Sequence, residues 1–253
     1  MSQSSQTPSR HALVTGASTG IGEETVRALV ATGWRVTATA RREDRLAALT
    51  EETGCHYHPA DLTSDDDVAR LVESVTSRGR VDALVNVAGG ALGVDTVAEA
   101  DLGRWQRMYD MNVLGTLRLT KAVLPHFGGE GGDLLFVTST AAHDTYPGGA
   151  GYVAAKHAER IIPLTLRQEL VGQPVRVIEI APGMVKTPEF SLNRLGSEDA
   201  AEDVYRGVEA PLSGADVAEA IAWTLNLPRH MNIDSMTIRP VAQATNTLVA
   251  RKG

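Results

Sequence analysis

Thr15-Gly16-Ala17-Ser18-Thr19-Gly20-Ile21-Gly22 joins a short apolar segment, residues 11–15, to an amphipathic segment, residues 21–31. These patterns predict a strand followed by a helix. Glycines at such a junction allow a tight turn and bring the backbone close to a pyrophosphate, which the N-terminus of the helix attracts. The glycine spacing, three residues and then one, differs from the commoner G-x-G-x-x-G, and a simple turn is the alternative. Because the loop follows the first strand of an alternating chain, we expect a dinucleotide site.

The rest of the chain continues to alternate short apolar runs with longer amphipathic segments. Strands are predicted at residues 34–40, 55–58, 81–87, 134–138, 175–180 and 235–239. Helices are predicted at residues 42–52, 65–77, 102–127, 150–170 and 215–225, and residues 183–207 are irregular or weakly helical. Pro163 predicts a kink or an irregularity in its helix. This order predicts an α/β fold of the Rossmann type, a three-layer sandwich with a doubly wound parallel sheet of about seven strands.

The composition excludes several classes of protein. Of 253 residues, 43% are hydrophobic and 22% are charged, and 24 basic against 31 acidic residues give a net charge of −7. A nucleic-acid scaffold would show a basic excess, and no apolar run approaches the roughly 18 residues that span a membrane. No clustered His, Cys or carboxylate spacing predicts a metal site. The single cysteine, Cys55, favours a reducing, cytoplasmic location.

The chain shows one boundary, close to its start. Residues 1–9 are polar and rich in Ser and Gln, so we expect a flexible N-terminal tail rather than a signal peptide. No linker, repeat or low-complexity block follows. Residues 10–253 are therefore predicted to form a single dinucleotide-binding domain.

Tyr152 and Lys156 stand in the stretch Tyr-Val-Ala-Ala-Lys of the predicted helix 150–170. Residues four apart share one face of a helix. A phenol beside a fixed ammonium exchanges a proton more readily near neutral pH, because the cation favours the phenolate. None of the other four tyrosines has a lysine at this spacing. The pair therefore predicts acid/base chemistry, and an exposed helical pair is the alternative.

The end of the second predicted strand, Thr39-Ala40-Arg41-Arg42, indicates which dinucleotide is bound. An NAD site usually places a carboxylate there, on the ribose 2′-hydroxyl. Here no carboxylate repels a 2′-phosphate, and a guanidinium binds one through charge-assisted hydrogen bonds. We therefore expect NADP(H), and two solvent-facing arginines are the alternative. Asp61, at the end of the third strand, is expected to meet the adenine or, equally, to serve as a helix cap or turn residue.

Thr-Gly-x-x-x-Gly-x-Gly near the start and Tyr-x-x-x-Lys near position 150 together resemble the short-chain dehydrogenase/reductase family over about residues 10–241. Asn86-Val87-Ala88-Gly89 is similar to the family's Asn-Asn-Ala-Gly, with Val87 in place of the second Asn. By this resemblance Ala40 stands where NAD users carry Asp, and Arg41 where NADP users carry Arg. Further matches are the helix with Trp105, Met108, Asn112 and Gly115, Ser139 thirteen residues before Tyr152, and the Pro182-Gly183 turn followed by Thr187.

The resemblance implies a hydride-transfer site in an NADP(H)-dependent oxidoreductase. Tyr152 is the implied acid/base, Lys156 supports it and binds the nicotinamide ribose, and Ser139 stabilises the charge on the substrate oxygen. Asn112 would hold a water that passes protons through Lys156 to solvent. The alternatives are a Ser139 that only ends a strand and an Asn112 amide satisfied by the backbone. The implied cofactor-binding residues are Gly16, Ser18, Thr19, Gly20, Ile21, Gly22, Arg41, Arg42, Asp61, Leu62, Asn86, Ala88, Gly89, Tyr152, Lys156, Pro182, Gly183, Val185 and Thr187.

Two later segments, Glu189-Phe190-Ser191-Leu192-Asn193-Arg194 and Ile238-Arg239-Pro240-Val241-Ala242-Gln243, are similar to the family's NADP-dependent 3-hydroxy acid (serine or L-allo-threonine) dehydrogenases. This likeness implies a substrate lobe at about residues 184–210 and a small 3-hydroxy acid, such as serine or 3-hydroxypropionate. Arg194 suits bidentate binding of a carboxylate, with a surface arginine as the alternative. The expected substrate residues are Ser139, His143, Tyr146 and Arg194, and a solvent-facing loop is the alternative for His143.

Two other functions stay open at this point. One is a carbonyl reductase for a larger ketone, such as a secondary metabolite or a 3-oxoacyl substrate, which would not need Arg194. The other is a non-catalytic NADPH-sensing protein, against which Ser139, Tyr152 and Lys156 argue. By resemblance, we expect a small-molecule alcohol or carbonyl substrate and a homotetramer or homodimer, with no nucleic-acid or membrane partner.

Overall fold

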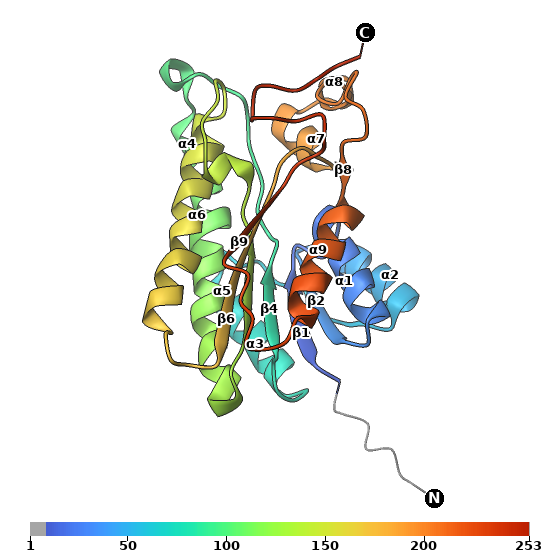
Figure 1. The fold of residues 1–253 in the computed structure, drawn as a ribbon, viewed down its shortest axis with the longest axis vertical. Coiled ribbons are helices and arrows are strands. Elements are labelled where there is room, and N and C mark those ends of the chain that lie inside the picture. The colour runs from blue at the N-terminus through green and yellow to red at the C-terminus, as the bar shows by residue number, and fades with distance from the viewer. Residues whose placement is uncertain (1–8, 253) are drawn as a thin grey trace, which may run out of the picture.

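Seven parallel strands form the central sheet of the computed structural model, which describes residues 9–252 (Figure 1). The chain winds outward from β1 to β3 and then returns to β4 on the other side of β1, giving the order β3-β2-β1-β4-β5-β6-β9. This is the Rossmann-type doubly wound order, so the predicted fold class is confirmed. The predicted tail, residues 1–9, lies outside the described residues except for Ser9. The strands are β1 (His11–Thr15), β2 (Arg35–Thr39), β3 (His56–Tyr57), β4 (Ala83–Asn86), β5 (Gly132–Val137), β6 (Val175–Pro182) and β9 (Ser235–Ile238).

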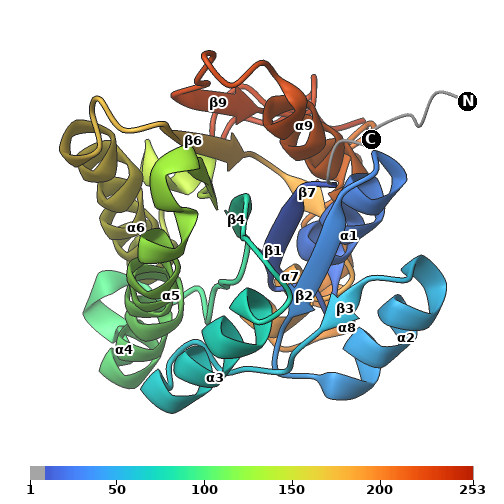
Figure 2. The same cartoon turned by 90° about the horizontal axis from the view of Figure 1, so that it is seen from below.

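Helices cover both faces of the sheet, as Figures 1 and 2 show. No helix among residues 9–252 is long and apolar enough to cross a membrane. The longest, α6, continues across Pro163, where the sequence predicts a kink or an irregularity. One face carries α1 (Gly20–Ala31), α2 (Glu43–Thr53) and α9 (Gly214–Asn226), and the other carries α3 (Asp65–Thr76), α5 (Gly115–Val123) and α6 (Ala150–Glu169).

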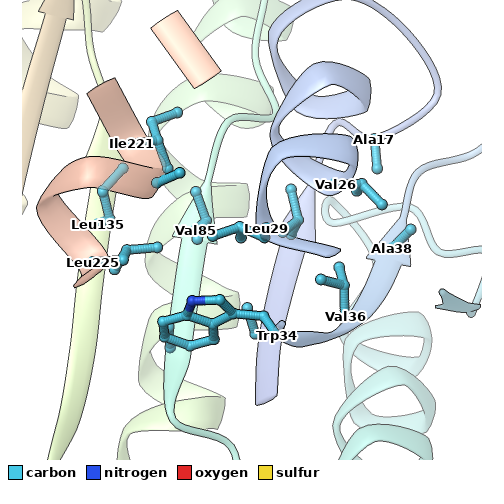
Figure 3. Close-up of a cluster of buried hydrophobic side chains, with 14 of the residues drawn as sticks. Ala17, Val26, Leu29, Trp34, Val36, Ala38, Val85, Leu135, Ile221 and Leu225 are labelled. Carbon is cyan, nitrogen blue, oxygen red and sulfur yellow. The ribbon is translucent and has the colours of Figure 1, made fainter. Parts of the chain in front are cut away.

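Alternate residues of each strand serve the two faces, because successive side chains of a strand point in opposite directions. In β1, Ala12 and Val14 belong to the core beneath α1 and α9, whereas Leu13 belongs to the core beneath α3 and α5. Figure 3 shows the first of these cores, in which Trp34 lies among aliphatic side chains of the sheet and of α1 and α9. Strands buried on both faces read as continuous apolar runs, which is the pattern that the sequence shows.

The prediction of one continuous helix at residues 102–127 is wrong. The chain forms α4 (Leu102–Tyr109), a wide π turn over Asp110–Leu114, then α5 and a 3₁₀ segment over Leu124–Glu130. Pro125 lies in the first turn of the 3₁₀ segment and has no N–H with which to continue the α-helix. Single π turns inside helices often mark functional sites, and this one contains Asn112.

A small lobe lies above the carboxyl ends of the strands, in the region predicted to be irregular or weakly helical (Figure 1). It contains β7 (Val185–Lys186), paired in parallel with β8 (Leu212–Ser213), and the short helices α7 (Phe190–Leu195) and α8 (Glu198–Asp203). The C-terminal segment runs along this lobe, where the backbone N–H of Lys252 donates to the Gly207 carbonyl at 2.7 Å. The organisation of residues 10–253 as one domain with this substrate lobe stays a prediction.

Candidate active site

A cleft of about 1280 Å³ opens between the carboxyl ends of the strands and the lobe. In open α/β sheets, ligands bind at this edge. Among the predicted cofactor-binding residues, Asn86 and Lys156 lie behind the lining. Those that line the cleft are Gly16, Ser18, Thr19, Gly20, Ile21, Gly22, Arg41, Arg42, Asp61, Leu62, Ala88, Gly89, Tyr152, Pro182, Gly183, Val185 and Thr187.

Close packing of the backbone explains the glycines of the first loop. Gly16 and Gly20 have φ angles of 65° and 57°, in the left-handed region that favours glycine. A Cβ on Gly22 would clash with the Gly16 carbonyl oxygen. Thr15 Oγ1 accepts a hydrogen bond from the backbone N–H of Ala88 at 2.9 Å, which ties the loop to the end of β4. The loop therefore has the tight turn and the bare backbone that suit a pyrophosphate.

The two arginines after β2 have different surroundings. The Arg42 guanidinium donates to both carboxylate oxygens of Glu189 in the lobe, at 2.7 and 2.8 Å, and to Ser18 Oγ at 3.0 Å. Arg41 is exposed, lines the cleft and makes no hydrogen bond or ion pair within residues 9–252. Arg41 is therefore the better placed of the two to bind an anion in the cleft.

Asp61 lines the cleft and also shapes the turn after β3. Its Oδ1 accepts hydrogen bonds from the backbone N–H and the hydroxyl of Thr63, at 2.9 and 2.8 Å. Partial burial raises the pKa of Asp61, but these two bonds and the charge of Arg41 outweigh burial and hold the pKa below its ordinary value. The turn role left open by the sequence is thus present in the structure, while the side chain still reaches the cleft.

Tyr152 and Lys156 lie one turn apart on the buried side of α6, as their spacing predicts. Tyr152 lines the cleft and packs edge-on against Phe190 of the lobe, with ring centroids 5.7 Å apart. Lys156 is buried, and its Nζ lies 6.0 Å from the Tyr152 ring centroid and donates to the Val137 carbonyl at 3.3 Å. The structure therefore fixes an ammonium beside a phenol that faces the cleft.

Ser139 reaches the same cleft from the end of β5. Its Oγ accepts a hydrogen bond from the Ala141 N–H at 3.1 Å, which caps the short 3₁₀ helix η4 (Thr140–Ala142). The hydroxyl proton is not used by that bond, so Ser139 keeps a donor for a ligand oxygen.

Asn112 lies in the π turn, and its side-chain amide forms hydrogen bonds with backbone groups. Its Nδ2 donates to the carbonyls of Gly90 and Met108, at 2.9 and 2.7 Å, and its Oδ1 accepts from the Gly90 N–H at 3.0 Å. This is the alternative that the sequence left open, an amide satisfied by the backbone. A Cβ on Gly89 would lie 2.5 Å from Asn112 Oδ1 and 3.4 Å from Lys156 Nζ, so both side chains flank Gly89. The proton path through Asn112 stays a prediction.

Glu159 is the residue of this region that the sequence reasoning missed. It is 1% exposed, and its Oε2 lies 2.6 Å from Lys156 Nζ. Burial raises the pKa of Glu159 to about 6, and the Lys156 ammonium opposes that rise. Burial alone would lower the pKa of Lys156, but the Glu159 carboxylate outweighs it and raises the pKa. The sequence could have indicated Glu159, because positions 152, 156 and 159 share one face of a helix.

Two of the expected substrate residues, Tyr146 and Arg194, lie together in the lining of the cleft. The Arg194 guanidinium lies 5.4 Å from the centroid of the Tyr146 ring. It also donates long hydrogen bonds to the carbonyls of Gly93, at 3.4 Å, and Gly148, at 3.5 Å. These contacts hold a cation in the lining of the cleft, between α7 and the segments that carry Gly93 and Gly148.

His143 does not line the cleft. Its Nε2 lies 3.2 Å from Oε1 of Glu179, a fully buried residue of β6 that also accepts hydrogen bonds from Thr138 and Arg160. The expectation that His143 contacts the substrate therefore finds no support in its position. A buried carboxylate contacts the side chain instead, and no local pattern predicted that contact, because Glu179 stands 36 positions further along the chain.

Residues of the C-terminal segment also reach the cleft. Gln243 Oε1 accepts a hydrogen bond from the Met184 N–H at 2.7 Å, and Asn246 Oδ1 accepts one from Thr140 Oγ1 at 2.7 Å. Both line the cleft. In the sequence, Gln243 stood out only as the last residue of Pro240-Val241-Ala242-Gln243, and no sequence pattern singled out Asn246. Within residues 9–252, no group of three or more His, Cys, Asp or Glu side chains is placed to hold a metal ion.

The family follows from a comparison with known sequences. A family model described as short chain dehydrogenase matches residues 10–195. The chain belongs to the short-chain dehydrogenase family. The resemblance predicted from the sequence is therefore confirmed, and this short-chain dehydrogenase is an oxidoreductase.

Relatives and solved structures show which members of the family this short-chain dehydrogenase resembles. It is 52% identical over 241 residues to an oxidoreductase of Mycobacterium tuberculosis, with 94% of each chain covered. It is 39% identical over 236 residues to serine 3-dehydrogenase of Agrobacterium fabrum, with 92% of this chain and 94% of the relative covered. A solved structure of the closed form of serine dehydrogenase complexed with NADP⁺ matches with a TM-score of 0.90 and 36% identity, over 96% of this chain and 100% of the other.

Proposed function

We propose that this short-chain dehydrogenase transfers a hydride between NADP(H) and the hydroxyl or carbonyl carbon of a small 3-hydroxy acid, such as serine or 3-hydroxypropionate. The observation that carries the proposal is a single cleft lined by the glycine loop, Arg41, Tyr152 and Arg194. The relative named serine 3-dehydrogenase supports the substrate class, and the serine dehydrogenase solved with NADP⁺ supports the cofactor. The homotetramer or homodimer and the cytoplasmic location stay predictions.

The cofactor fits the residues at the nucleotide end of the cleft. The first loop packs against the end of β4, where a Cβ on Gly16 would lie 3.0 Å from the Ala88 backbone. The glycines of this loop line the cleft, where bare backbone suits the close approach of a diphosphate. Arg41 offers an exposed guanidinium after the end of β2, next to Ala40, the position at which NAD users carry an acid. These residues would hold the pyrophosphate and the 2′-phosphate.

The reaction needs few protein groups. When bound, NADP(H) accepts or supplies the hydride. In oxidation Tyr152 takes the proton of the substrate hydroxyl, and in reduction it returns one to the substrate oxygen. The Ser139 hydroxyl donates a hydrogen bond to that oxygen and stabilises the charge that develops there. The buried Lys156 ammonium lies 6.0 Å from the centroid of the Tyr152 ring and would bind the nicotinamide ribose.

A turnover screen tests this proposal. NADP⁺ is supplied with L-serine, 3-hydroxypropionate or simple alcohols, and NADPH with their oxidation products or with bulky ketones. We expect NADP⁺-dependent oxidation to be fastest with the 3-hydroxy acids. Faster reduction of bulky ketones would replace the proposal with the carbonyl reductase, and NADPH binding without turnover of any substrate would replace it with the sensor.

Arg194→Ala tests the substrate end of the cleft. Because the guanidinium pairs with the substrate carboxylate, we expect kcat/KM for L-serine to fall by roughly 10- to 100-fold, as for the loss of a charge-assisted hydrogen bond. Turnover of an uncharged alcohol should change little. Arg206→Ala is the matched control, because Arg206 is an exposed arginine of the same lobe that does not line the cleft. Equal losses for serine and for the uncharged alcohol would remove the carboxylate assignment.

Arg41→Ala tests the nucleotide end. We expect NADPH binding to weaken by about 1.5–3 kcal/mol, because the guanidinium loses a charge-assisted contact with the 2′-phosphate. NADH binding should barely move, and fluorescence titration of both cofactors measures the difference. Arg45→Ala serves as the control, since Arg45 is exposed on α2 and lies outside the cleft lining. Equal weakening for NADPH and NADH would contradict the 2′-phosphate contact.

A further inference from the structure

A carboxylate lies buried next to the lysine of the proposed redox site. Glu159 and Lys156 stand three residues apart in α6, and their side chains are 1% and 4% exposed. Their charged atoms are 2.6 Å apart. A buried carboxylate is costly unless a counter-charge and hydrogen bonds compensate it, so this contact determines the charge state of both residues.

The other elements around Glu159 leave Lys156 as its cationic partner among residues 9–252. From α5, the hydroxyl of Thr116 faces the Glu159 carboxylate and lowers its pKa. From β6, Glu179 faces it as a like charge and raises the pKa of Glu159 further. Glu179 is itself held by Arg160, at 3.2 Å from its Oε1, so that guanidinium is engaged elsewhere. His143, at 3.2 Å, also belongs to the Glu179 cluster.

The ion pair constrains both the position and the charge of Lys156. The ammonium donates to the Val137 carbonyl at 3.3 Å, and its Nζ lies 2.6 Å from Glu159 Oε2. Nζ also lies close to Gly89, where a Cβ would come within 3.4 Å of it. The carboxylate also offsets part of the positive charge that acts on Tyr152, whose ring centroid lies 6.0 Å away.

We propose that Glu159 is a positioning residue of this site, which holds the Lys156 ammonium in place and, by offsetting its charge, sets the pH range in which Tyr152 exchanges its proton. This inference rests on the proposed function, since it assigns Tyr152 as the acid/base. Glu159 touches neither substrate nor cofactor and acts through Lys156.

The sign of the effect follows from the charges. Above a pH of about 6 Glu159 is ionised, because its pKa is about 6, and it weakens the pull of the ammonium on the phenol proton. Replacing it with glutamine removes the negative charge and leaves the ammonium uncompensated, so Tyr152 gives up its proton at lower pH. Below pH 6 the wild-type carboxyl is protonated too, and the difference between the two proteins fades.

Glu159→Gln tests the inference through the pH profile of kcat/KM for NADP⁺-dependent oxidation. We expect the acidic limb to move to lower pH by about one unit, as for the loss of one nearby charge. Glu159→Leu, which also lacks the charge, should move the limb in the same direction, whereas Glu159→Asp should leave it near the wild-type position. Glu169→Gln is the control, since Glu169 is an exposed carboxylate at the end of the same helix.

A second readout does not depend on turnover. Protein labelled with [ζ-¹³C]tyrosine gives five resonances, and the Tyr152 signal is identified by its loss in Tyr152→Phe. We expect its titration midpoint to move by about one pH unit to lower pH in Glu159→Gln. Glu159→Gln and Glu159→Leu both lack the charge, and at least one of them should fold. If that variant has the same Tyr152 titration midpoint and the same acidic limb of kcat/KM as wild type, the inference is overturned. If wild type turns over no substrate, the proposed function fails, and the tyrosine titration still decides the role of Glu159.

Discussion

Tyr152→Phe is expected to reduce turnover by roughly 10²- to 10⁴-fold, the range that general acid/base catalysis contributes. The variant loses only the phenol oxygen, which lies on the side chain that faces the cleft beside Lys156. Its ring keeps the edge-on contact with Phe190, at 5.7 Å between centroids, so the lobe should stay in place. Steady-state rates with NADP⁺ and a 3-hydroxy acid measure the loss.

Two further measurements separate lost chemistry from lost structure. NADPH affinity and the melting temperature should stay close to the wild-type values in Tyr152→Phe. Tyr109→Phe removes a phenol oxygen from a tyrosine that is 43% exposed on α4 and lies outside the cleft lining, and its turnover should be unchanged. An unchanged rate in Tyr152→Phe would remove this residue as the acid/base.

The parts of the fold and site that the sequence predicted are those that depend on local spacing. The glycines of residues 16–22 stand where a strand meets a helix, and the tight turn expected there is present, with left-handed φ angles at Gly16 and Gly20. Tyr152 and Lys156 share a helical face because they are four residues apart. The parallel direction of the strands follows from the alternation of apolar and amphipathic segments, because crossover connections of this kind build parallel sheets.

The parts that the sequence could not predict depend on contacts between distant segments. The Arg42–Glu189 pair joins positions 147 residues apart, and no local pattern distinguishes Arg42 from Arg41. The place of His143 in the chain predicts a cleft residue, but its Nε2 contacts Glu179 of β6, which stands 36 positions away in the sequence. Asn246 likewise reaches the cleft only through the course of the C-terminal segment. Glu159 differs from these, because its helical spacing was visible and only its burial was unknown.

The largest expected loss of stability comes from Asp133→Asn, at roughly 3–5 kcal/mol in the free energy of unfolding, as for breaking a buried ion pair. Asp133 of β5 and Arg176 of β6 are 0% and 4% exposed at their side chains, and two hydrogen bonds of 2.7 Å join them. The same guanidinium donates to the carbonyls of Leu225, at 3.0 Å, and Thr224, at 3.2 Å, at the end of α9. Denaturant titration of the purified variant measures the loss.

The size of this loss comes from the charge that is left behind. Asparagine has nearly the shape of aspartate, but its amide nitrogen cannot accept a bond from Arg176, so the guanidinium would stay buried against carbonyl groups alone. Removing both charges in Asp133→Leu/Arg176→Met should therefore recover much of the stability, which a double-mutant cycle measures directly. Asp203→Asn gives the comparison at the surface, where the pair with Arg206 is exposed and should contribute no more than about 1 kcal/mol. If Asp133→Asn lost no more stability than Asp203→Asn, the buried Asp133–Arg176 pair would not be what stabilises the junction of β5, β6 and α9.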